Sequence, residues 1–104
     1  MDLTPGTKLA STVCATEVII VRPPSQTVAL ECGGAPMVAA EEAPEEGARG
    51  SVDATRAEGT MLGKRYVHEA SGLEVLCTKP GAGSLSAEGV ALPLKEAKPL
   101  PSSD

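Results

Sequence analysis

The stretch Glu17-Val18-Ile19-Ile20-Val21-Arg22 carries the strongest secondary-structure signal in the chain. Its β-branched residues favour an extended strand, in which branched side chains pack well on a pleated surface. Residues 23–26 (Pro-Pro-Ser-Gln) interrupt the pattern, and residues 27–30 resume it. Two such runs separated by a short Pro-containing break predict a β-hairpin.

The second half of the chain follows the same plan. Residues 72–77 are a predicted strand, residues 79–83 a turn, and residues 84–86 a returning strand. No long apolar period of the helical kind is present, although a short helix around residues 40–46 is compatible with the sequence as far as Pro44 allows. The expected fold class is therefore small and all-β.

The two halves also share one spacing of apolar residues. Nine positions separate Val21 from Leu30, and nine separate Leu76 from Leu85. Self-similarity of this kind indicates an internal repeat. The register continues through the pairs Met37 and Leu92, Gly34 and Gly89, and, with two extra residues after Cys14, Leu9 and Tyr66.

Composition divides the chain into four segments. Residues 1–38 form the first predicted unit, residues 39–60 an acidic linker, residues 61–95 the second unit, and residues 96–104 an extended, Pro-punctuated tail. Large aliphatic residues are few, so the expected core is thin for a chain of this size. A metal, a disulfide or a partner is the usual remedy, and we expect a partner protein.

Charge and composition exclude several function classes. The net charge is −5, and no basic stripe is available to neutralise nucleic-acid phosphates. One tyrosine and no tryptophan or phenylalanine leave no aromatic platform for stacking bases. No run approaches the roughly 20 apolar residues of a membrane span. We expect no secretory signal, a cytoplasmic location and reduced thiols for the three cysteines.

The two repeats resemble a known family at specific stretches. The first ends with Leu30-Glu31-Cys32-Gly33-Gly34-Ala35-Pro36-Met37. The second runs from Tyr66-Val67-His68 through Gly72-Leu73-Glu74-Val75-Leu76 to Leu92. Desulforedoxin and the N-terminal module of desulfoferrodoxin are similar: an aromatic residue precedes Cys-x-x-Cys-Gly, and a Val-rich strand, a Gly-rich turn, a Leu strand and Cys-Cys-Gly-x-Pro-Met follow. The resemblance implies two tandem β-hairpin knuckles packed as a pseudo-dimer, joined by the irregular acidic linker.

In that family four cysteine thiolates hold one iron. Carried over by position, the four ligand slots fall on Ser11, Cys14, Cys32 and Gly33 in the first repeat, and on His68, Ser71, Ala87 and Glu88 in the second. A tetrahedral Fe or Zn site requires four suitable ligands. The first repeat retains two thiols and the second retains none, so the resemblance extends to the scaffold and not to the redox activity.

Cys14 and Cys32 are the candidate site residues, and three interpretations remain open. They are first interpreted as two buried, reduced thiols. The alternatives are a Zn or Fe site completed by Cys77, His68 or a partner, and a disulfide. His68 is interpreted as a space-filling, hydrogen-bonded side chain. A Lys beside Cys77 lowers a thiol pKa in some sites, but no base accompanies it, so a nucleophilic role is not expected.

An acidic run and a pair of glycines are two further features of the sequence. Glu41, Glu42, Glu45 and Glu46 form an acidic run, interpreted as a solvated linker, with docking on a basic partner as the alternative. Gly81 and Gly83 lack the Gly-Lys-Ser/Thr ending of a phosphate loop. They are expected to permit positive φ in the turn.

These observations favour a non-catalytic accessory subunit that binds and stabilises a larger protein or enzyme complex. No catalytic residue and no cofactor are expected, and self-association into a homo-oligomer is an alternative for the partner. The second hypothesis is a small metal-binding protein, redox or structural, that holds Zn or Fe through Cys14 and Cys32. A third, an enzyme built on Cys77 or His68, has the least support.

Overall fold

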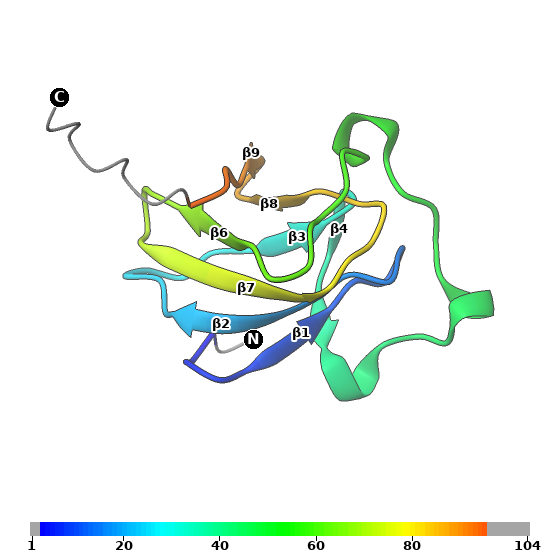
Figure 1. The fold of residues 1–104 in the computed structure, drawn as a ribbon, viewed down its shortest axis with the longest axis horizontal. Coiled ribbons are helices and arrows are strands. Elements are labelled where there is room, and N and C mark those ends of the chain that lie inside the picture. The colour runs from blue at the N-terminus through cyan, green and yellow to red at the C-terminus, as the bar shows by residue number, and fades with distance from the viewer. Residues whose placement is uncertain (1–2, 96–104) are drawn as a thin grey trace, which may run out of the picture.

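A computed structural model describes residues 3–95, and the predicted tail at residues 96–104 lies outside the described residues. Residues 3–95 form nine strands and three short 3-10 turns, with no α-helix among them. The strands make two antiparallel sheets that lie one over the other (Figure 1). The prediction of a small all-β fold is confirmed.

The larger sheet has five strands in the order β5-β1-β2-β7-β6. Its strands are β1 (Lys8–Ala10), β2 (Glu17–Arg22), β5 (Val38–Ala39), β6 (Arg65–His68) and β7 (Leu73–Lys79). The smaller sheet has four strands in the order β4-β3-β8-β9. Its strands are β3 (Leu30–Cys32), β4 (Ala35–Pro36), β8 (Leu85–Ala87) and β9 (Val90–Ala91).

The strand pairing follows the repeat seen in the sequence. Ile20 on β2 lies opposite Val75 on β7, and Glu31 on β3 lies opposite Ser86 on β8. In each pair the two residues hold the same position in their repeats. Each sheet is therefore joined across its middle by equivalent strands, one from each repeat. The packing of the halves as a pseudo-dimer of desulforedoxin-like knuckles stays a prediction.

The predicted hairpins between residues 17–22 and 27–30, and between residues 72–77 and 84–86, are wrong. β2 and β3 lie in different sheets, as do β7 and β8. The reason is that β1 and β7 already occupy both edges of β2. In addition, Pro23 and Pro24 have no backbone N–H with which to continue a ladder. The chain instead crosses from one sheet to the other at these points.

Two tight hairpins occur elsewhere, at the β3–β4 and β8–β9 connections. Each has a two-residue turn: Gly33-Gly34 with φ of 65° and 87°, and Glu88-Gly89 with φ of 51° and 77°. Positive φ at both central residues is the requirement of a type I′ turn, which matches the twist of the flanking strands. The turns occupy equivalent positions of the two repeats, and Glu88 stands where the first repeat has a glycine.

One hydrophobic core is shared by both repeats. Leu9, Val18, Leu73 and Val75 enter it from the larger sheet, and Leu30, Cys32 and Leu85 enter it from the smaller sheet. Most of these side chains are almost fully buried. Burial of an aliphatic side chain contributes roughly 1.5–3 kcal/mol. The two predicted units therefore stabilise one another through common contacts.

The acidic linker leaves the sheets and then returns to them (Figure 1). Its first half contains the 3-10 turns η1 (Ala40–Glu42) and η2 (Glu46–Ala48) on either side of Pro44, in place of the short helix considered at residues 40–46. The four glutamates of the acidic run are exposed. The second half contains η3 (Ala54–Arg56), whose first turn is capped by Asp53. No helix in residues 3–95 is long and apolar enough to cross a membrane.

Candidate thiol site

Cys14 and Cys32 are brought together by the fold. Cys14 lies in the loop between β1 and β2, Cys32 ends β3, and their Sγ atoms are 3.8 Å apart. Both residues are buried, and both are free thiols, as is Cys77. The two cysteines thus share one small interior site at the contact between the two sheets.

Hydroxyl groups surround the sulfur of Cys14. Ser11 Oγ lies 3.3 Å from it and Thr16 Oγ1 lies 3.2 Å from it. The backbone N–H of Gly83, from the other repeat, donates to the same sulfur at 3.4 Å. Ser11 Oγ also accepts the backbone N–H of Cys14 at 3.1 Å, so it shapes the turn that presents the thiol.

The surroundings of the two thiols shift their pKa values in opposite directions. Burial alone would raise the pKa of Cys14, but its hydrogen bonds with Ser11, Thr16 and Gly83 stabilise the thiolate and lower the pKa to about 7. Burial raises the pKa of Cys32 to about 12, and the adjacent charge of Cys14 acts in the same direction. Near neutral pH the pair therefore has one acidic thiol beside one that retains its proton.

Cys77 lies on β7 opposite Val18, and its thiol has a different set of contacts. Its Sγ donates to the carbonyl of Lys79 at 3.1 Å, and burial raises its pKa. The neighbouring lysine, which could have lowered this pKa, is not among the causes of its shift. The ammonium of Lys79 is turned to Glu17, with Nζ 3.0 Å from Oε2, and does not serve the thiol.

The first repeat gathers only part of a metal-ligand set. Ser11, Cys14 and Cys32 meet, while Gly33, the fourth slot, has no side chain to offer. Within residues 3–95 no group of three or more His, Cys, Asp or Glu side chains is placed to hold one metal ion. Neither Cys77 nor His68 completes such a group. The donors at the site are two thiols and the hydroxyls of Ser11 and Thr16, and hydroxyls are poor partners for Zn.

The corresponding slots of the second repeat hold a buried His–Ser pair. His68 Nδ1 lies 2.7 Å from Ser71 Oγ, at the positions that Ser11 and Cys14 occupy in the first repeat. Both residues are buried. His68 lines a cavity of about 410 Å³ with Val67, Glu69, Ala70, Val90, Ala91 and Pro93. The expected hydrogen-bonded role of His68 agrees with this contact.

Gly81 and Gly83 allow the backbone of their loop to lie close to the thiol site. The expectation of positive φ at these two residues is wrong. Neither has φ in the left-handed region. A Cβ at Gly83 would lie 2.7 Å from the Cα of Gly33 and 3.3 Å from the Cys14 sulfur. A Cβ at Gly81 would lie 2.5 Å from the backbone nitrogen of Thr16. Their missing side chains let the loop of the second repeat pack directly on the thiol site.

A second hydrogen-bonded layer lies behind the thiols. Thr16 Oγ1 is 2.8 Å from Thr60 Oγ1, which in turn accepts the backbone N–H of Gly81 at 3.0 Å. Sequence reasoning missed Thr16 and Thr60, because isolated threonines have no spacing that marks them. The chain from Thr60 through Thr16 to Cys14 ties the end of the acidic linker to the site.

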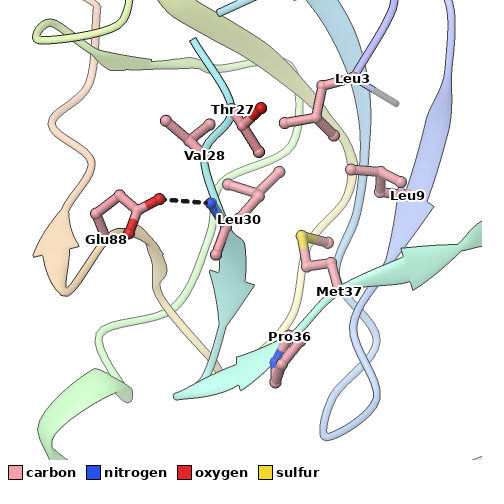
Figure 2. Close-up of a pocket in the computed structure, with 9 residues that line it drawn as sticks. Leu3, Leu9, Thr27, Val28, Leu30, Pro36, Met37 and Glu88 are labelled. Atoms are coloured by element: carbon pink, nitrogen blue, oxygen red, sulfur yellow. Dashed lines mark hydrogen bonds between the residues drawn. The ribbon is translucent and has the colours of Figure 1, made fainter. Parts of the chain in front are cut away.

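Another hollow, of about 410 Å³, lies at the opposite end of β3 (Figure 2). Its walls are mostly apolar, and Leu3, Leu9, Leu30 and Met37 are among them. Its one carboxylate, Glu88, accepts the backbone N–H of Ala29 at 3.0 Å, as the dashed line in Figure 2 shows. This hollow therefore presents no pair of titratable groups for acid–base chemistry.

Comparison with known proteins yields no relative. No family model matches the chain, and no curated protein or solved structure matches it. The resemblance to desulforedoxin stays a prediction based on the quoted residues.

Proposed function

We propose that this chain is a non-catalytic accessory protein that binds and stabilises a larger protein through an apolar surface of its second repeat. The observation that carries the proposal is the exposure of large apolar side chains there. Leu62 is 64% exposed, Val90 57% and Met61 49%. A contiguous apolar patch that is open to water commonly marks a contact with another protein, whereas scattered single side chains do not.

These side chains belong to neighbouring hollows. Val90, Ala91 and Pro93 line one cavity, and Met61, Ala91 and Pro93 line the next. Leu62 follows Met61 directly in the chain. The surface therefore extends from β9 to the first residues of the second unit, directly after the acidic linker. The thiols, in contrast, are buried away from it, which supports a structural role for the interior and a binding role for this surface.

The test is co-purification at native levels with a surface variant and a matched control. Val90→Lys combined with Leu62→Lys places two charges in the proposed surface. Val21→Lys places one at an exposed valine on β2, outside both hollows. We expect one protein to be recovered in stoichiometric amount with the wild type and with Val21→Lys, and to be lost with the double variant. Amide NMR spectra establish that each variant is folded.

Two results would overturn this function. The first is a wild-type chain that elutes alone at native levels. The second is a partner that binds the double variant as well as it binds the wild type.

A second candidate function, metal binding, is supported by the 3.8 Å between the sulfurs of Cys14 and Cys32. Two thiolates about 2.3 Å from one tetrahedral Zn ion lie about 3.8 Å from each other. Elemental analysis of protein purified without chelators tests this function. One metal ion per chain that is lost in Cys32→Ser would support it, and an equal metal content in both proteins would remove it.

A further inference from the structure

The first repeat carries its own cover, formed by residues 50–53, here called the covering segment. Gly50 donates its backbone N–H to the carbonyl of Thr12 at 3.0 Å, and Asp53 donates to the carbonyl of Gly33 at 2.9 Å. Between them, Val52 packs against the core cluster. Two backbone hydrogen bonds and one aliphatic anchor thus hold an extended stretch of the linker on this face.

The equivalent face of the second repeat is open. Thr12 corresponds to Glu69 and Val13 to Ala70, in the register that also aligns Ser11 with His68. Thr12 and Val13 are half-buried under the covering segment, whereas Glu69 and Ala70 are exposed. In the next hairpin, Gly33 is buried and its counterpart Glu88 is exposed. No segment among residues 3–95 covers the second repeat in the way that residues 50–53 cover the first.

A cavity is present on this open face. Val67, His68, Ala70 and Val90 are among its walls, and they surround a space of about 410 Å³. The cavity is lined mainly by apolar groups, and His68, held by Ser71 at Nδ1, adds one polar ring edge. Its position and lining suit a branched aliphatic side chain, as Val52 provides on the first repeat.

The open face of the second repeat differs in charge from the covered face of the first. Glu69 lines the cavity where the first repeat has the uncharged Thr12, and the whole chain carries a net charge of −5. Arg56 of this chain lies at the adjoining turn, but its Nη2 donates to the carbonyl of Gly89 at 2.8 Å, and no ion pair within residues 3–95 neutralises Glu69 or Glu88. A basic occupant is therefore favoured over an acidic one. The covering segment of a second copy, which carries Asp53, is a poor match.

We infer that the open face binds an extended, basic segment of a partner protein. The segment donates two backbone N–H groups to the carbonyls of Glu69 and Glu88, and it inserts a branched aliphatic side chain beside Ala70 and Val90. This inference rests on the proposed accessory function and names the chemistry of the partner. It follows the recognition of extended peptides in which main-chain hydrogen bonds supply affinity and pockets supply selectivity.

The chain supplies its own probe for the experiment. A capped peptide is made with the sequence of residues 49–54, Arg-Gly-Ser-Val-Asp-Ala, in which Asp is replaced by Lys. It is titrated into the full, isotope-labelled chain and followed by amide NMR. We expect saturable shifts at Glu69, Ala70, Glu88 and Val90. The unsubstituted peptide should bind about tenfold more weakly, and a peptide with Asp in place of Val should not bind.

A chain variant provides the matched control. Ala70→Arg fills the cavity from an exposed position and should abolish the shifts, whereas Val21→Lys should leave them unchanged. The inference is overturned if millimolar peptide causes no shifts, or if the shifts fall on Thr12 and Gly33 because the peptide displaces the covering segment. Binding that requires removal of residues 96–104 also overturns it, because the face would then belong to the chain's own tail.

The accessory function and the proposed peptide chemistry are contradicted by different results. If the partner is lost from the Val90→Lys and Leu62→Lys variant but the basic peptide does not bind, the accessory function stands and the peptide chemistry is wrong. If neither the partner nor the peptide binds the wild type, both proposals fall.

Discussion

The sulfurs of Cys14 and Cys32 lie 3.8 Å apart in the interior, although the two residues are 18 positions apart in the chain. One comes from a loop of the larger sheet and the other from a strand of the smaller sheet. Their closeness therefore reports the way in which the two sheets pack. Cys32 has the higher pKa because its thiol is the more deeply buried and lies beside the charge of Cys14, whereas hydrogen bonds with Ser11, Thr16 and Gly83 lower the pKa of Cys14.

Mild oxidation should join these two thiols. A disulfide has an S–S distance of about 2.05 Å, so the sulfurs must approach by about 1.8 Å, a shift that small side-chain rotations can supply. We expect treatment with a thiol oxidant to leave Cys77 as the single alkylatable cysteine in the denatured chain. Closure of a loop of this length should stabilise the fold by about 3 kcal/mol. Peptide mapping and urea unfolding measure the two effects.

The control for this prediction is Cys77→Ser, which should form the same disulfide. Mixed linkages to Cys77 in the wild type, or a lower stability after oxidation, would contradict the arrangement of the site.

Cys14 should titrate near pH 7 in the folded chain. Its pKa lies below the ordinary value of 9.0, because hydrogen bonds to the thiolate outweigh burial. A group with a lowered folded pKa adds stability as pH rises, from about the folded value up to the unfolded value. Stability should therefore increase between pH 7 and 9 in the wild type, and Cys14→Ser should lack this increase. Urea unfolding at several pH values provides the measurement.

A spectroscopic titration separates the contributors. The ultraviolet absorbance of the thiolate should show one step near pH 7 that Cys14→Ser removes and that Ser11→Ala moves to higher pH. An unchanged midpoint in Ser11→Ala would show that this hydroxyl does not stabilise the thiolate.

The fold was predictable where it depends on apolar spacing and unpredictable where it depends on which strands become neighbours. The repeat register placed Ile20 level with Val75, and the structure pairs them. The predicted hairpins that contain these two residues are wrong, because β2 and β3, and likewise β7 and β8, lie in different sheets. A strand pattern followed by a turn pattern has the same sequence signature whether the chain folds back within one sheet or crosses to the other. The pairing of Cys14 with Cys32 followed from the resemblance, whereas Thr16, Thr60 and the close approach of Gly83 depend on tertiary contacts.

Glu74 should make the fold sensitive to acid. Its carboxylate is buried on β7, with Lys95 Nζ at 2.8 Å and Arg65 Nη1 at 3.3 Å. The hydrogen bond with Lys95 is the main cause that holds its pKa below the usual value. Its contribution to stability is present above pH 4.5 and is lost as pH falls through the lower folded value. Glu74→Gln should cost about 1 kcal/mol at pH 7, because its two partners are partly exposed.

The same variant should narrow the difference in stability between pH 7 and pH 3, as measured by urea unfolding. Glu17→Gln is the matched control, because its ion pair with Lys79 is exposed on the lysine side and should add little. If both variants show the acid sensitivity of the wild type, the buried carboxylate is not its source.

Gly83→Ala should destabilise the chain because it forces apart the two repeats at the thiol site. The added Cβ would lie 2.7 Å from the Cα of Gly33, and that neighbour is backbone and cannot rotate away. Overpacking of this kind costs about 1–3 kcal/mol. Gly47→Ala is the matched control, since no heavy atom lies within 4 Å of its added Cβ and its φ is not positive. Urea unfolding should show a loss for the first variant and no loss for the second.

The effect on Cys14 distinguishes this explanation from a general loss of stability. Moving the loop of residues 81–83 away removes the N–H that Gly83 donates to the Cys14 sulfur, so the thiolate titration should shift to higher pH in Gly83→Ala. A variant that is less stable but has an unchanged Cys14 midpoint would mean that the strain is relieved at Gly33 and that the loop stays in contact with the sulfur.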